Sequence, residues 1–168
     1  MATRHRGHGQ EGVALLEAAL TLPLLVVLML NVANFGMYIY AWVTVNNAAR
    51  ALLQYRVYTG VVLGYPPVPS QSQMDTLVTT EVSSLPNRAS VTWEVCGPAK
   101  AGVPDCKGTG TAFAADADPA NPTHYTLYSA NVSYTFNSLF PPLTLPFGYT
   151  VAGVPGAVSR RVSMRSMQ

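Results

Sequence analysis

Charged side chains are scarce in this chain. They make up 11% of its 168 residues, whereas hydrophobic residues make up 49%. An average soluble domain carries roughly 25% charged residues. The composition therefore argues against a well-solvated globule and against intrinsic disorder. The net charge is only +2, so no nucleic acid is expected among the partners.

Residues that carry catalysis or bind metals are also few. Of three histidines, His5 and His8 lie near the start of the chain, and His124 stands alone. Two cysteines are too few for a four-ligand zinc site without histidine. The sequence holds no nucleophile elbow, P-loop, zinc-protease or dinucleotide-binding motif. We therefore predict no catalytic residues, no metal, no cofactor and no enzymatic activity.

A long uncharged run near the N-terminus is the clearest feature that the sequence does have. No charged residue occurs between Glu17 and Arg50. About 20 apolar residues cross the hydrocarbon core of a bilayer as a helix. Tyr38, Tyr40 and Trp42 near the far end fit an interfacial aromatic belt. The run therefore predicts one transmembrane helix.

The short basic segment before this run sets the expected orientation. It translocates nothing large, so we place the N-terminus in the cytoplasm and the rest of the chain outside it. A cleaved secretory signal is the alternative. Such a signal has an apolar core of about 7–15 residues and a small-residue cleavage site. Here the core is longer, and no clean site precedes Asn46.

The start of the run contains a glycine, a glutamate and a proline at informative positions. Glu17 lies five residues after Gly12, and Pro23 follows six residues later. This arrangement resembles the N-terminus of a type IV prepilin, in which a prepilin peptidase cuts after a glycine and the fifth mature residue is glutamate. The resemblance implies a cut between Gly12 and Val13 that leaves the apolar segment on the protein.

Glu17 has two interpretations on its local sequence alone. It is either an interfacial acid near the start of a helix, where the helix dipole favours a negative charge, or an assembly residue. In the second case, cleavage creates an ammonium group at Val13. Pairing this group with Glu17 between neighbouring subunits would offset the desolvation of both charges and set the axial register. Pro23 is expected to kink the helix, with or without a function.

The following segment resembles a particular pilin family. The apolar stretch after Pro23, the pair Phe35–Gly36 and the segment Asn47-Ala-Ala-Arg50 are similar to the TadE-like minor pilins of the tight-adherence (Tad) pilus system. The resemblance is best from residue 12 to 56. Major pilins of this system often carry tyrosine where Ala18 stands, and they are shorter. Both differences indicate a minor pilin or pseudopilin.

The resemblance also implies a function and partners. It implies a structural protein of the bacterial inner membrane, with roles in pilus biogenesis and adhesion. The expected partners are a prepilin peptidase, other pilins of the same pilus, the inner-membrane assembly platform and membrane lipid. A different function stays open: an uncleaved, single-span envelope protein whose head binds a ligand or partner.

The helix is expected to continue beyond the membrane to about residue 58. Six apolar residues at spacings of three and four form one stripe, which would pack on a head domain, and Arg56 lies off this stripe. The alternative is a separate short helix after a break. The stripe consists of Val45, Ala48, Ala49, Leu52, Leu53 and Val57. The predicted organisation is a leader (1–12), a transmembrane and stalk helix (13–58) and an extracytoplasmic head (59–168).

The head is predicted to be a small antiparallel sheet with one short helix. The helix spans residues 72–84, with Ser70 or Ser72 as its cap. Residues alternate between apolar and polar over 91–95 and 128–136, and again near 158–164, as in half-buried strands. Together with the long helix, this predicts an α+β fold.

Two further segments of the head carry specific expectations. Residues 97–123 are rich in Gly, Ala, Pro and Asp and predict a long loop. Cys96 and Cys106 bracket its first part, and outside the cytoplasm a disulfide between them is the simple interpretation. The apolar segment 141–149 either packs on the head or contacts another subunit.

Overall fold

The structure is a computed structural model that describes residues 8–61, 69–100, 103–111, 113, 125–138 and 156–167. The apolar segment 141–149 and His124 lie outside these residues. The described elements are α1 (His8–Val61), α2 (Gln71–Glu81), the 3₁₀-helix η1 (Arg88–Ser90), β1 (Thr92–Lys100), β2 (Val103–Gly108), β3 (Tyr125–Thr135) and β4 (Ala157–Met167).

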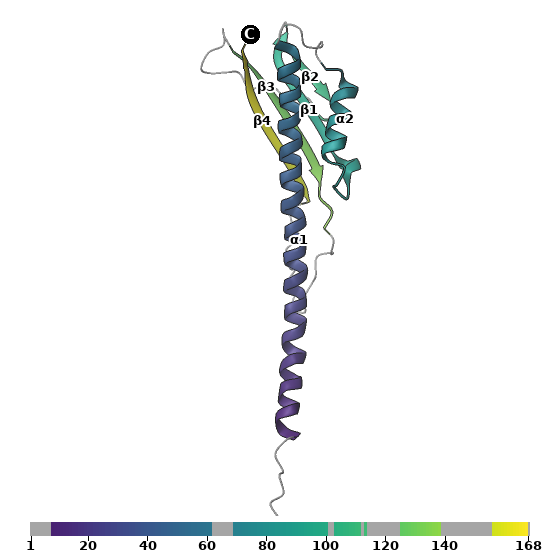
Figure 1. Ribbon diagram of the computed structural model, residues 1–168, viewed down its shortest axis with the longest axis vertical. Coiled ribbons are helices and arrows are strands. Elements are labelled where there is room, and N and C mark those ends of the chain that lie inside the picture. Colours follow the sequence, from purple (N-terminus) through teal and green to yellow (C-terminus); the bar gives the residue numbers. More distant parts are fainter. Residues whose placement is uncertain are drawn as a thin grey trace, which may run out of the picture.

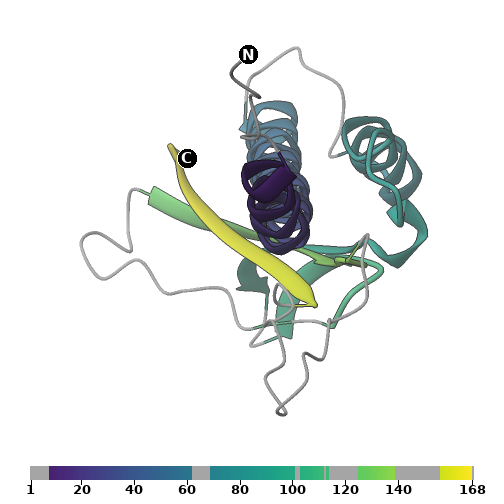
Figure 2. The same ribbon diagram turned by 90° about the horizontal axis from the view of Figure 1, so that it is seen from below.

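A single long helix and one sheet make up the architecture (Figure 1). The four strands form an antiparallel sheet in the order β2-β1-β3-β4. The C-terminal half of α1 crosses one face of this sheet with α2 beside it, as the view along the helix shows (Figure 2). The predicted α+β fold is confirmed. Because α1 is continuous over 54 residues, the alternative of a separate helix after a break is wrong.

The core lies between α1 and the sheet. All six residues of the predicted stripe on α1 are buried, with Val57 the most exposed at 7%. Burying such side chains stabilises the fold by roughly 1.5–3 kcal/mol each for the larger ones. The sheet contributes the inward-facing side chains Trp93, Val95, Ala130, Val132, Tyr134 and Val158. The three predicted strands are confirmed as parts of β1, β3 and β4.

The short helix α2 begins directly after its N-capping residue, Ser70. The Ser70 side chain accepts a hydrogen bond from the backbone N–H of Gln73, whose own side chain returns to Ser70. This reciprocal pair satisfies two N–H groups that a helix start leaves free. Met74 and Val78 are buried against the core. The helix ends at Glu81, three residues before the predicted end.

The prediction of a loop over residues 97–123 is wrong for its first part. β1 continues to Lys100, and Val103–Gly108 forms the edge strand β2. Pro, Asp and Gly are poor strand formers, so composition hid this strand. Its pairing with β1 is irregular beyond Gly97, which is where Pro104 falls. Proline is tolerated in such an edge position because no second neighbour needs its N–H.

Candidate functional site on the exposed half of α1

The N-terminal half of α1 projects away from the head (Figure 1). We call residues 12–33 the bare half, because nearly all their side chains are exposed and the first buried residue along α1 is Asn34. Its most apolar window has a mean hydropathy of 2.5 and none of it is buried. A core helix of a soluble protein would be covered. This helix is therefore long and apolar enough to cross a membrane.

Uncharged polar side chains in the bare half bond to its own backbone. The Thr21 hydroxyl donates to the Glu17 carbonyl at 2.9 Å, and the Asn31 amide donates to the Val27 carbonyl at 2.7 Å. These internal bonds satisfy the Thr21 hydroxyl and one of the two N–H groups of the Asn31 amide, which lowers the cost of placing these side chains in hydrocarbon. The polar residues of this segment are thus compatible with lipid.

Glu17 is the exception, since it is the only charged residue from Gly12 to Asn34. Its side chain is exposed and has no partner among the residues that the structure describes. Val13, which is 65% exposed, lies four residues earlier and so on the same helix face. The Gly12–Val13 bond lies in the first turns of α1, where helices fray. The cleavage and the assembly role of Glu17 stay predictions.

Pro23 lies inside α1, which is helical on both sides of it. Proline has no N–H, so the Ala19 carbonyl lacks its usual intrahelical partner. The Thr21 hydroxyl makes a second, longer bond to the Ala18 carbonyl at 3.4 Å, close to this gap in the ladder. The kink expected at Pro23 stays a prediction.

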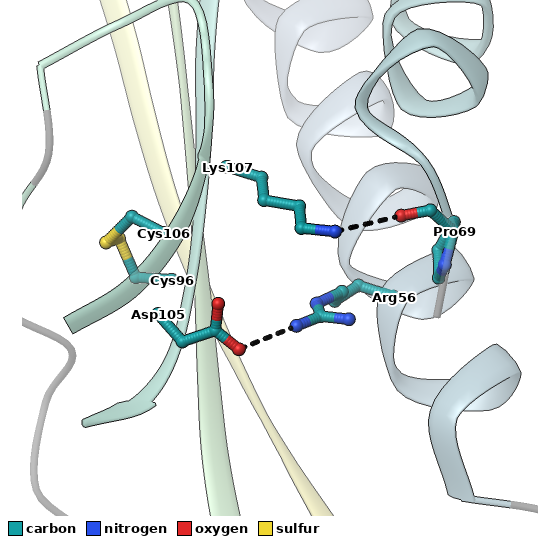
Figure 3. Close-up of polar contacts among 6 residues, drawn as sticks. All are labelled: Arg56, Pro69, Cys96, Asp105, Cys106 and Lys107. Atoms are coloured by element: carbon teal, nitrogen blue, oxygen red, sulfur yellow. Dashed lines mark hydrogen bonds and ion pairs between the residues drawn. A yellow bond between two sulfur atoms is a disulfide. The ribbon is translucent and has the colours of Figure 1, made fainter. Parts of the chain in front are cut away.

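A second cluster, which sequence reasoning missed, joins the other end of α1 to the sheet (Figure 3). Arg56 was expected off the apolar stripe, yet it is only 5% exposed, and its guanidinium lies 3.2 Å from the Asp105 carboxylate of β2. It also lies 5.6 Å from the centre of the Tyr128 ring. The position of Arg56 between Leu53 and Val57 was the available signal.

The predicted disulfide between Cys96 and Cys106 is confirmed. The two residues are directly opposite each other in β1 and β2. The bond therefore ties the edge strand that carries Asp105 to the rest of the sheet. Nearby, Lys107 donates to the Pro69 carbonyl at 3.5 Å, which links β2 to the segment before α2 (Figure 3).

Glu94 is a carboxylate close to this disulfide, and it is 5% exposed. Burial raises its pKa above 4.5, against a smaller lowering by a backbone hydrogen bond from Gly110. Its carboxylate and the two sulfurs lie within 4.8 Å of one another. Disulfide sulfurs are not thiolate ligands, so this group does not match a metal site.

An open groove of about 420 Å³ lies between α1 and α2. Its lining holds one carboxylate, Glu81, and neither histidine nor cysteine. A general acid–base pair or a nucleophile with an adjacent base would need further groups here. The lining residues are Tyr55, Gln73, Thr76, Leu77, Thr80 and Glu81.

A comparison with known proteins finds a family similarity, and it lies along α1. Residues 12–52 match the model of the TadE-like protein family. This match covers about a quarter of the chain and begins at the predicted cleavage site. It indicates a protein associated with the Tad pilus, of a family that is generally structural. No curated protein and no solved structure is significantly similar to the chain.

Proposed function

We propose that this protein is a minor pilin or pseudopilin of the Tad pilus. A prepilin peptidase cuts it between Gly12 and Val13 on the cytoplasmic side of the bacterial inner membrane. The bare half of α1 then anchors the head outside the cytoplasm until the helix packs with those of other pilins. The protein serves pilus biogenesis and adhesion as a structural component and not as an enzyme.

One observation carries this proposal. The TadE-like match starts at Gly12 and runs along α1, and the same helix begins with an exposed apolar half whose single carboxylate is Glu17. Lipid covers such a helix before assembly, and neighbouring helices cover it afterwards. Glu17 and the new ammonium at Val13 each need a partner in that setting, because an unpaired charge in a low dielectric is costly.

The first experiment is an intact mass of the protein from membranes of its native host. A mature chain beginning at Val13 supports the proposal. The Gly12→Leu variant should stay uncut, and no atom within 4 Å would obstruct a side chain there. Gly36→Leu is the matched control, since Gly36 is equally open. This variant should still be cut, so its mature mass should differ from that of the wild type only by the substitution itself.

The second experiment separates insertion from assembly. Glu17→Gln keeps the size of the side chain and removes its charge, so it should insert into the membrane but lower piliation. Glu81→Gln, an exposed change on α2, is the control. An uncut wild-type chain, with normal piliation of the Gly12 and Glu17 variants, would instead favour a single-span envelope protein whose head binds a ligand or partner.

A further inference from the structure

The end of the head from which the bare half projects carries a second membrane contact. We propose that this end rests on the phospholipid headgroups of the leaflet that α1 leaves, with Arg88 facing the lipid phosphates. We call it the rim and define it by Phe35, Ile39 and Tyr40 of α1, Arg88 of η1 and Phe136 after β3. The inference rests on the membrane anchoring proposed above.

The length of the bare half places the head directly at the membrane. Residues 12–33 are 22 positions, which extend about 33 Å as an α-helix. The hydrocarbon core is about 30 Å thick. The next residue, Asn34, is already only 9% exposed. The apolar span therefore ends where contact with the head begins, and no stalk separates the two.

Two contacts fix the head to α1 just beyond this point. The Tyr38 and Phe136 rings meet edge to face, with 5.6 Å between their centres. The Tyr40 hydroxyl donates to the Ser84 hydroxyl at 2.8 Å. Tyr38 lies about 7.5 Å along the axis from residue 33, and each headgroup layer is about 5–7 Å thick. The contacts thus lie at the level of the headgroups or just above it.

The exposed side chains of the rim suit this environment. Phe35 is 57% exposed, Ile39 is 45% exposed and Tyr40 is 48% exposed. Phe35 and Ile39 are one helical turn apart and so share a face. Aromatic side chains gather at the membrane interface because an apolar ring and a polar edge both find partners there. Lipid would cover apolar surface that the head leaves open.

Arg88 brings a positive charge to the same end. The preceding residue, Asn87, donates to the carbonyl of Thr135 at 3.1 Å, and Thr135 is the neighbour of Phe136 in the chain. Arg88 itself is exposed, with one long bond of 3.5 Å to the Ser83 carbonyl. A guanidinium binds phosphate oxygens well, and a cation close to an anionic leaflet is attracted to it.

Depth-dependent quenching tests the inference on the full chain in vesicles. Both cysteines of the sequence are in the disulfide, so one added cysteine can be labelled alone with an environment-sensitive fluorophore. We would label Pro86→Cys, two residues before Arg88 of the rim, Gln54→Cys about 21 Å beyond Tyr40 along α1, and Leu25→Cys in the bare half; all three sites are exposed. The vesicles contain phosphatidylcholine and phosphatidylglycerol with nitroxides on headgroups or on acyl chains.

The expected result is a gradient. Headgroup nitroxide should quench the label at residue 86 several-fold more strongly than the label at residue 54, and acyl-chain nitroxide should quench the label at residue 25. Adding Arg88→Glu should weaken quenching at residue 86. Arg50→Glu, an exposed change on the same molecule, should not.

Three outcomes would count against the inference in different ways. Equal, weak quenching at residues 86 and 54 with strong quenching at residue 25 would mean that the head stands clear of the membrane while the anchor is inserted. Weak quenching at residue 25 would overturn the membrane anchoring itself. Unchanged quenching at residue 86 in Arg88→Glu would overturn the assignment of the phosphate contact to Arg88.

Discussion

The two halves of α1 belong to one continuous helix, but they differ in how their apolar side chains are covered. Residues 12–33 are apolar on all sides and exposed, whereas residues 41–57 bury one stripe against a sheet and turn Asn47, Arg50 and Gln54 outward. A helix that is apolar all round needs lipid or other helices around it. The difference shows that the chain's own sheet covers the apolar surface of the second half of α1, whereas the first half depends on lipid or other chains to cover it.

Matched leucine substitutions test this contrast most strongly. Leu52 is fully buried and Leu24 is 68% exposed. Leu52→Ala should lower the free energy of unfolding of the head by about 2–5 kcal/mol, because it leaves a cavity, and Leu24→Ala should leave it unchanged. Denaturation in detergent, followed by Trp93 fluorescence in a Trp42→Phe background, measures both. An equal loss in the two variants would mean that the bare half supports the head.

Removing the disulfide should have the next largest effect, again confined to the head. The double variant Cys96→Ser, Cys106→Ser releases the closure of a short loop, which is worth roughly 2–3 kcal/mol in the entropic model. It also frees the edge strand that holds Asp105 against Arg56. Reduction of the wild type should cause the same loss of stability, and reductant should not affect the double variant. Equal stability of the oxidised and reduced wild type would contradict the prediction.

The sequence predicted the elements that have a clear period and missed those that depend on contacts. The stripe on α1 and the alternation in β3 follow from burial on one face, so both were predictable. The strand β2 was not, because pairing with β1 and the disulfide overcome its poor composition. Burial of Arg56 was also missed, since its partners Asp105 and Tyr128 are distant in the sequence.

For the candidate site, the sequence predicted which residues matter but not what surrounds them. Gly12, Val13 and Glu17 were singled out from spacing and resemblance, and the structure adds that they lie on an exposed helix. Whether a protease or a neighbouring helix meets them depends on other chains. The rim around Arg88 could not be predicted, because it forms only when η1, the end of β3 and α1 come together.

Two glycines sharpen the contrast between packed and open backbone. A Cβ at Gly108 would overlap the Trp93 carbonyl oxygen, whereas nothing lies within 4 Å of a Cβ at Gly36. Gly108→Ala should therefore destabilise the head by about 1–3 kcal/mol, as overpacking does. Gly36→Ala should cause no loss, since alanine favours the helix. Thermal unfolding of both variants is the measurement, and a stable Gly108→Ala protein would show that β2 shifts freely.

The smallest expected effect is on the pH dependence of stability. It concerns the two carboxylates in apolar surroundings, Glu94 in the head and Glu17 in the bare half. Burial raises the pKa of Glu94 above 4.5, so the folded chain binds this proton more tightly than the unfolded chain. The stabilisation from Glu94 is therefore present at low pH and is lost as the pH rises from 4.5 through the raised pKa.

Glu94→Gln should remove this decline in stability. The variant should be at least as stable as the wild type at neutral pH, and the stability of the wild type relative to the variant should fall as the pH rises through this window. Glu17→Gln should leave the pH dependence of the head unchanged, because Glu17 contacts no described residue of the head. Denaturation curves between pH 4 and pH 8 measure all three proteins. A relative stability that rises with pH would mean that ionised Glu94 has a partner that stabilises its charge.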